Sequence, residues 1–325
     1  MCQDLGSLAQ ENALTSPSPA IETFELAKSY GTKAAVRGLS LRVERGEVFG
    51  FLGPNGAGKT TTVKMLLGLV RPTSGDATVL GRPIASPSAR AKVGYLPEHF
   101  RFHEWLRVDE FLDVHARLND VSREMRSRRI PELLELVGLT AAARQQLGTY
   151  SKGMLQRAGL AQALVSDPDL VFLDEPTSGL DPMGRRLVRD VIHRLSERGV
   201  TVFLNSHLLS EVEVTCTRVG FITGGQIREV VPLASALNGL VRVTLRLGNV
   251  DDALRRGLAR WGRLVEPGAD PRLVALDVPD EECLPEIARW LVGQGVALYG
   301  MAPQRLSLED LFVSIVGSDR SWETS

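Results

Sequence analysis

The sequence contains no long hydrophobic run. No uncharged apolar stretch among its 325 residues approaches the length of about 18 that a membrane-spanning helix needs, so no span is expected. The first twenty residues also lack an apolar core, because Asp4 and Glu11 interrupt them. A secretory signal is therefore not expected. Both absences predict a cytoplasmic protein.

Cysteine and surplus charge are equally scarce. Cys2, Cys216 and Cys283 are too few and too scattered for a disulfide framework or a metal site, which favours a reducing compartment. The 38 Lys and Arg residues balance 39 Asp and Glu residues, which leaves a net charge of −1. Because broad neutralisation of nucleic-acid phosphates needs a surplus of cations, no nucleic-acid partner is expected.

The remaining composition is that of an ordinary globular protein, with 43% apolar and 24% charged residues over about two domains' length. Four short runs are apolar on both faces, at 48–52, 170–173, 200–204 and 219–222. A strand without a polar face is buried on both sides, which predicts an α/β fold with a parallel sheet. A charged, helix-rich stretch at about 101–165 is interpreted as an inserted helical subdomain.

The two ends of the sequence differ from this central part. Residues 1–20 are rich in Ser and Pro near their end and are predicted to be a disordered lead-in. Residues 232–316 show the order strand, helix, strand, strand, helix, strand, which begins with the alternating apolar and polar residues of 241–247. This order predicts a small α+β, ferredoxin-like accessory domain, and a short tail follows it at 317–325.

A phosphate-binding loop is predicted at 53–60. Its sequence fits the pattern G-x-x-x-x-G-K-[ST], with an apolar strand before it and a helical stretch after it. The glycines let backbone N–H groups turn toward phosphates, and the N-terminus of the helix adds partial positive charge. Lys59 is expected to reach the terminal phosphates, while the Thr60 hydroxyl is expected to bind Mg²⁺.

A pair of carboxylates ends the apolar run at 170–173. Because adjacent residues at a strand end point in different directions, Asp174 is expected to face Mg²⁺ and Glu175 an attacking water. Pro176 stops the strand directly afterwards. A solvent-facing acidic pair is the alternative, and the upstream phosphate loop favours the functional interpretation.

With these and further ordered motifs, the chain resembles the nucleotide-binding subunits of ATP-binding cassette (ABC) transporters over about residues 21–228. Tyr150–Arg157 is similar to the signature motif of that family, and Ser178–Pro182 is similar to its D-loop. His207 resembles its switch histidine, and Tyr30 stands where the family stacks an aromatic ring on adenine. Ser151 is also expected to cap the helix that follows it, whatever its further role.

The resemblance implies a P-loop NTPase (RecA-like) fold for residues 21–231 and an ATPase that uses ATP and Mg²⁺. It implies a second copy of the chain across the nucleotide sites and a separate membrane permease, which would hold the protein on the inner face of the cell membrane. The residues that it assigns fall into four groups: Glu175 and His207 in catalysis; Tyr30, Gly53, Pro54, Asn55, Gly56, Ala57, Gly58, Lys59, Thr60 and Thr61 for ATP; Ser151, Gly153 and Asp181 in trans; and Thr60, Asp174 and Glu98 for Mg²⁺.

Some residues depart from the commonest family pattern. Glu98 stands where Gln is usual, and the signature has Lys152 and Met154 where Gly and Gln are usual. Together with the tail sequence at 308–312, these departures resemble the drug-exporter-like branch, whose members carry an extra C-terminal domain. The resemblance therefore implies an exporter without naming its cargo.

The inserted helical subdomain contains Phe100, Phe102, Trp105 and Phe111, which are expected either to dock the permease or to form the core of that subdomain. Two other functions are considered for the whole chain. A soluble ABC-type ATPase would act on a partner outside the membrane, but the tandem cassettes or basic stretches usual in such proteins are missing. A small-molecule kinase would leave the motifs at 150–157 and 178–182 without a role.

Overall fold

The computed structural model of the protein describes residues 18–99, 102–237, 241–265, 270, 272–305 and 307–316. Its chain divides into two compact units. The first contains the chain up to Ser206 together with Ile222–Ile227, and the second contains His207–Phe221 and the chain from Arg228 onward. The predicted tail lies outside the described residues, as does all of the predicted lead-in except residues 18–20.

Parallel strands form the centre of the first unit, in the order β3-β8-β7-β6. Every residue of β3, β7 and β8 is buried, which confirms the prediction made from their two-sided apolar runs. The bounds of these strands are β3 Val48–Leu52, β6 Val93–Leu96, β7 Leu170–Asp174 and β8 Thr201–Asn205.

Aromatic side chains pack between neighbouring strands of this sheet. The ring of Phe203 on β8 lies 5.6 Å from that of Phe49 and 5.3 Å from that of Phe51, both on β3. Phe172 on β7 lies 5.3 Å from the same ring. All four side chains are at most 1% exposed. These rings form part of the buried core beneath the strand ends from which the loops of the site leave.

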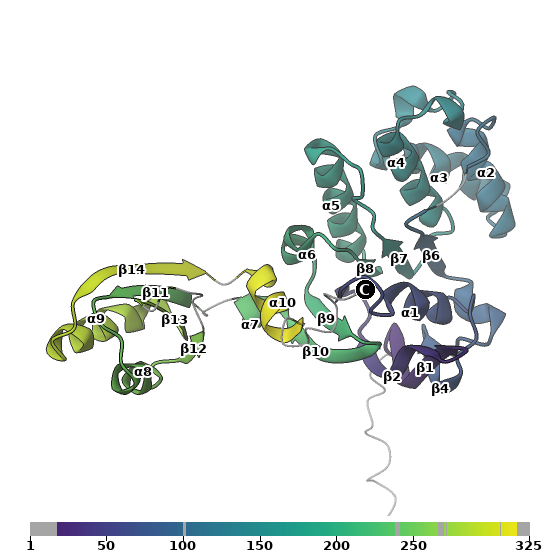
Figure 1. Ribbon diagram of the computed structural model, residues 1–325. Helices are drawn as coiled ribbons and strands as arrows, with labels where there is room; N and C mark the ends of the chain where they lie inside the picture. Colours follow the sequence, from purple (N-terminus) through teal and green to yellow (C-terminus); the bar gives the residue numbers. More distant parts are fainter. Residues whose placement is uncertain are drawn as a thin grey trace, which may run out of the picture. The chain divides into compact units, whose positions relative to one another are not determined.

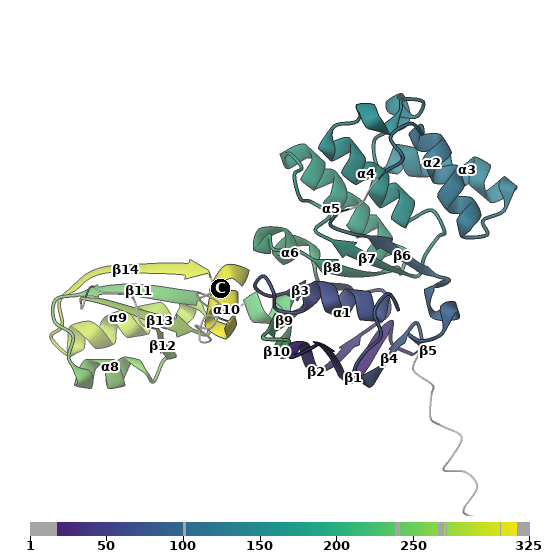
Figure 2. The same cartoon turned by 45° about the vertical axis from the view of Figure 1, so that its right-hand side comes forward.

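A second, antiparallel sheet has the order β2-β1-β4-β5. Figures 1 and 2 both place helix α1 between this sheet and the parallel one, with α4 (Lys152–Ala163) and α5 on the other side of the parallel sheet. The helix α1 buries Val63, Met65 and Leu66. The bounds are β1 Ile21–Tyr30, β2 Lys33–Val43, β4 Ser74–Val79, β5 Arg82–Pro83, α1 Lys59–Leu66 and α5 Pro182–Glu197.

The chain between β6 and β7 is helical. It contains α2 (Val108–Leu118), α3 (Arg123–Leu136) and α4 (Lys152–Ala163). Phe111 of α2 is 5% exposed and its ring lies 5.4 Å from that of Phe102. These two aromatics therefore pack inside the helical subdomain, as the second of the two interpretations above expects.

The second unit begins with α6 (Leu209–Thr215) and ends with α10 (Leu308–Val316). The strands β9 (Arg218–Thr223) and β10 (Gln226–Pro232) belong to it except for residues 222–227, and α7 is Leu233–Leu237. An antiparallel sheet of order β12-β13-β11-β14 follows. Its elements are β11 Val241–Leu247, α8 Asp252–Leu258, β12 Arg263–Val265, β13 Leu273–Val278, α9 Leu284–Gly293 and β14 Leu298–Arg305.

The helices α8 and α9 share one apolar core with this sheet. Leu258 of α8, Ile287 of α9 and Val243 of β11 are all fully buried in it. The cluster explains the helical spacing of apolar residues in this part of the sequence. Among the described residues, no helix has the length and apolar character to cross a membrane.

Candidate functional site

The phosphate loop leaves the carboxyl end of β3 and leads into α1. Gly58 is the N-cap of α1 and has a left-handed φ of 104°. A Cβ atom on Gly58 would lie 2.4 Å from the carbonyl oxygen of Ala35 on β2. Only glycine fits this position without movement of the backbone. The close approach to β2 therefore sets the curvature of the loop.

The turn between β9 and β10, at Gly225, also contacts the phosphate loop. The N–H of Gly225 donates to the carbonyl oxygen of Ala57 at 3.1 Å, and the N–H of Arg37 donates to the carbonyl oxygen of Gly225 at 2.8 Å. These backbone hydrogen bonds join the loop, β2 and the turn into one scaffold. Asn55 and Gly56, at the outer side of the loop, are exposed. The loop thus keeps a fixed base and an open outer side.

The ammonium group of Lys59 lies over the loop. Its Nζ donates to the carbonyl oxygens of Gly53 at 2.7 Å and Pro54 at 3.1 Å. Burial lowers the pKa of Lys59, while Glu175, Asp174 and Glu98 oppose that shift by their charge. The lysine is therefore a partly desolvated cation within electrostatic range of three carboxylates. Such a cation interacts more strongly with phosphate than one in bulk water.

Asp174 ends β7 and is 3% exposed. The amide Nδ2 of Asn205, at the matching position on β8, donates to its Oδ1. Burial raises the pKa of Asp174; the Asn205 hydrogen bond and Lys59 lower it, and Glu98 and Glu175 raise it further. The carboxylate is thus held without full hydration, which makes a cation at this position favourable.

Glu175 has an uncommon backbone conformation, with φ at 52°. Its N–H donates to the carbonyl oxygen of Asn205 at 2.8 Å, and its own carbonyl oxygen accepts a hydrogen bond of 3.2 Å from Nε2 of Gln156 on α4. The side chain is 7% exposed. Left-handed backbone at a non-glycine residue costs free energy and persists where neighbouring contacts hold it. Here Asn205 and Gln156 hold it.

Both of these supporting residues were missed from the sequence. The contact of Asn205 depends on β7 and β8 lying side by side, and that of Gln156 depends on the packing of α4 under the end of β7. A polar residue directly after an apolar run was the available signal for Asn205. Gln156 lies within the motif at 150–157, but nothing in the sequence marks it as a partner of the Glu175 backbone.

Asp174, Glu175, Glu98 and Thr60, which with Lys59 are called the cluster, provide the oxygen donors that Mg²⁺ prefers. It holds three carboxylates against one ammonium, and Thr60 presents an exposed hydroxyl on the first turn of α1. No group of three or more His, Cys, Asp or Glu residues within the described ranges can hold a metal by itself. Since Mg²⁺ commonly completes its ligands with phosphate oxygens and water, these residues fit an ion bound together with a nucleotide.

Tyr30 lies at the end of β1 and is 51% exposed. The Nζ of Lys28 lies 5.2 Å from the centre of its ring. The same β1–β2 hairpin carries Ala35, which contacts the phosphate loop. An exposed aromatic ring on a hairpin that reaches the loop is suited to stacking on a base, which is the role that the family resemblance implies for Tyr30.

The signature and D-loop residues lie apart from the phosphate loop. Ser151 is the N-cap of α4, as expected, and its Oγ accepts a hydrogen bond of 3.2 Å from the N–H of Met154. Asp181 caps α5 in the same way, with its Oδ1 accepting from the N–H of Gly184 at 2.7 Å. Both capping residues are exposed, so each of these helix N-termini begins at the surface of the chain.

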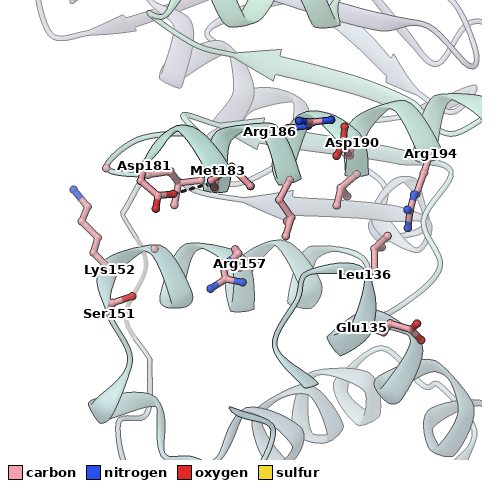
Figure 3. A pocket seen from close by; sticks show the side chains of 16 residues that line it. Glu135, Leu136, Ser151, Lys152, Arg157, Asp181, Met183, Arg186, Asp190 and Arg194 are labelled. Carbon is pink, nitrogen blue, oxygen red and sulfur yellow. Dashed lines mark hydrogen bonds between the residues drawn. The ribbon is translucent and has the colours of Figure 1, made fainter. Parts of the chain in front are cut away.

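A cleft of about 860 Å³ lies between α4 and α5 (Figure 3). Ser151, Lys152 and Gly153 line it from α4, and Asp181 lines it from the start of α5. Further along α5, Arg186, Asp190 and Arg194 continue the lining. None of the described residues 53–60 lines this cleft. The two sets of predicted site residues are thus separated within one chain.

Three further predicted residues, Glu98, His207 and Trp105, are exposed. Glu98 follows β6, and its side chain is 49% exposed, with an oxygen 3.9 Å from Nδ1 of His99. His207 is exposed and is the first residue of the second unit. In the helical subdomain, Trp105 is 69% exposed, while Phe100 lies outside the described residues.

Comparison with known proteins gives a consistent result. The model of the ABC transporter family matches residues 36–178. An uncharacterised ABC transporter ATP-binding protein of Synechocystis is 48% identical over 216 residues, which cover 64% of this chain and 61% of that protein. The chain thus spans about three fifths of the length of that relative. The linearmycin resistance ATP-binding protein LnrL of Bacillus subtilis is 32% identical over 91% of this chain and 98% of its own length.

Solved structures show the same fold. The ATP-binding subunit of an ABC transporter has a TM-score of 0.62 and 28% identity, and the match covers 66% of this chain and 90% of that one. A dimeric bacterial ABC transporter cassette, MJ0796, has a TM-score of 0.61 and 23% identity, and the match covers 66% of this chain and 98% of that one. The P-loop NTPase fold predicted for the first part of the chain is therefore confirmed.

Proposed function

Because the chain belongs to the family of ABC transporter ATP-binding proteins, we propose that it binds and hydrolyses ATP to drive export through a separate membrane permease. One observation carries the hydrolytic part of this proposal. The partly desolvated Lys59 of the phosphate loop lies within electrostatic reach of Asp174, Glu175 and Glu98. This supports a common site for the proposed cation, metal ligand and general base.

Each residue of the cluster has a role in this proposal. Backbone N–H groups of the loop and the Lys59 ammonium bind the phosphates of ATP. Thr60, Asp174 and Glu98 hold Mg²⁺, which when bound offsets charge on the phosphate oxygens. The carboxylate of Glu175 orients a water and accepts its proton. His207 is a proposed second catalytic residue on the strength of the family resemblance alone.

A second copy of the chain completes the site in this proposal. Ser151 and Gly153 lie at the open N-terminus of α4, which is suited to bind a γ-phosphate. Their cleft is separate from residues 53–60 of the same chain, so a partner copy is the natural owner of that phosphate. Closing and reopening of such a dimer would transmit motion to the permease.

Export, rather than import, rests on the relatives. The similarity to a linearmycin resistance protein covers 91% of this chain, including the C-terminal unit. We infer export because removal of a compound from the cell is the way in which a transporter ATPase would confer resistance. The exposed side chains of Trp105 and Leu118 on the helical subdomain, 69% and 74% exposed, are proposed contacts for the permease.

Phosphate release by the purified full-length chain with Mg²⁺ and ATP tests the hydrolytic part. We expect turnover that Glu175→Gln lowers by about 10²–10⁴-fold, since a general base typically contributes that much. ATP affinity should stay within about twofold of the parent. Glu197→Gln, an exposed glutamate at the end of α5, is the matched control and should hydrolyse ATP normally. Equal loss in both variants, or no turnover in the parent chain, would refute the assignment.

A further inference from the structure

Helices α6 and α10 pack against each other in the second unit, although their sequences lie far apart. The helix α6 begins two residues after His207, and α10 is the last described helix of the chain. Leu308 and Val316 at the two ends of α10 are 0% and 2% exposed. The ring of Phe312 on α10 lies 6.2 Å from that of Phe221 on β9. The helix α10 is therefore an integral part of this packing.

The N-terminus of α10 is capped by its own residues and by α6. Asp310 and Ser307 exchange hydrogen bonds: Oγ of Ser307 donates to Oδ2 of Asp310 at 2.7 Å and accepts from the N–H of Asp310 at 3.2 Å. The N–H of Leu308 donates to Oε2 of Glu213 on α6 at 3.0 Å. The first N–H groups of a helix have no partner within it, and a carboxylate there is favourable.

The same aspartate connects α10 to the accessory sheet. Its Oδ1 accepts a hydrogen bond of 3.1 Å from Nη1 of Arg242 on β11. The other guanidinium nitrogens of Arg242 contact both oxygens of Asp277 on β13, at 2.7 and 3.1 Å. The exposed fractions of these three side chains are 22% for Arg242, 15% for Asp277 and 33% for Asp310. A two-pronged, charge-assisted contact of this kind has a defined geometry.

The helix α6 depends on such contacts for its order. It has seven residues, and its N-cap, Leu208, makes no side-chain capping hydrogen bond. Isolated helices shorter than about 12 residues are marginal in water, so tertiary packing must stabilise α6. The buried side chain of Val212 and the contact of Glu213 with α10 provide this packing.

We propose that Glu213, Asp310 and Arg242 are positioning residues that couple the C-terminal domain to the segment beginning at His207. The proposal rests on the proposed function, because the segment matters for turnover only if His207 takes part in hydrolysis. The C-terminal domain then sets the order of residues 207–215 through α10 and α6, and a change in that domain alters turnover rather than ATP binding.

Hydrogen–deuterium exchange of the full-length chain, combined with ATPase kinetics, tests this coupling. In Asp310→Ala and Glu213→Ala we expect exchange of residues 207–215 to rise by about tenfold, the equivalent of about 1.4 kcal/mol. The kcat for ATP should fall in proportion to the loss of the ordered fraction of this segment, while KM stays within about twofold. Glu213→Gln keeps an acceptor oxygen for the N–H of Leu308 and should recover most of both values.

Glu309→Ala is the matched control. Glu309 is the neighbouring acid in the first turn of α10 and is exposed. Equal exchange of residues 207–215 in Asp310→Ala and Glu309→Ala would overturn the proposal. So would raised exchange with an unchanged kcat, because α10 would then stabilise the segment without affecting turnover.

Failure of the proposed function and failure of the coupling give different results. If the parent chain does not hydrolyse ATP, the proposed function fails, and the kinetic half of the coupling fails with it. The exchange data still decide whether α10 orders residues 207–215. Should Asp310→Ala not fold, Arg242→Lys replaces it. That variant keeps the charge but not the two-pronged contact with Asp277, and we expect the same effects at a smaller size.

Discussion

The phosphate loop and the α6–α10 contact are both arranged around the N-terminus of a helix, but different parts of the chain supply them. At α1, the backbone itself curves around the helix end, and Gly58 permits the curvature. At α10, the side chain of Glu213, 95 residues earlier, accepts the hydrogen bond of the helix end. A site made by backbone needs particular residues at fixed spacing, whereas one made by side chains uses common residues from distant elements.

The largest difference is expected from a change in the backbone-built loop. In Gly58→Ala, the new Cβ atom would lie 2.4 Å from the carbonyl oxygen of Ala35, and the left-handed φ costs about 1–2 kcal/mol. We expect ATP affinity, measured by titration, to fall at least about tenfold. Gly293→Ala in α9, where a Cβ atom meets no neighbour, is the control. An affinity within twofold of the parent would show that the loop adapts.

A change in the side-chain network should have a smaller and separate effect. Arg242→Ala leaves the carboxylates of Asp277 and Asp310 without their charged donor. We expect the unfolding transition of the C-terminal unit to lose about 1–3 kcal/mol in a denaturant titration, with ATP affinity unchanged. Arg246→Ala, on the exposed side of the same strand, should stay within about 0.5 kcal/mol of the parent. A loss of ATP affinity in Arg242→Ala would contradict the claim that this network and the phosphate loop act independently on stability and on ATP binding.

The smallest expected effect on stability concerns the charge of Asp174. Burial raises its pKa, so the folded chain gains stability when this group is protonated and loses that gain as the pH rises through its folded pKa. Asp174→Asn imitates the protonated form. Its melting temperature should therefore exceed that of the parent at neutral pH, and the difference should shrink as the pH is lowered.

Hydrolysis should nevertheless be lost in Asp174→Asn, because an amide binds Mg²⁺ less well than a carboxylate. Asp76→Asn, at an exposed position of β4, is the control for the melting curves. A lower melting temperature for Asp174→Asn at neutral pH would mean that its ionised form stabilises the fold.

The same contrast explains what could be predicted from the sequence. The buried strands and the loop at 53–60 were predictable, because a two-sided apolar run and a glycine pattern each follow from a steric requirement. The end of β7 was predictable as well, because two carboxylates directly after an apolar run are a distinct sequence pattern. The exposed Trp105 and the buried Phe111 could not be told apart, because both occur in the same helical stretch.

Contacts between distant elements could not be predicted. The hydrogen bond of Asn205 to Asp174 requires knowing that β8 lies beside β7. The tail residues Leu308–Phe312 were noted for their family resemblance, but nothing in the sequence indicates that the N–H of Leu308 meets Glu213. Such pairings follow from how the whole chain packs, and single-sequence patterns carry little information about them.

Purification of the tagged full-length chain from its native membranes in mild detergent, followed by mass spectrometry, tests the central claim most directly. The account predicts a stoichiometric partner with several membrane-spanning segments, in an amount that falls when the exposed Trp105 and Leu118 are replaced by Ser. A soluble partner, or an active ATPase that remains in the cytosol without any partner, would contradict the transport function.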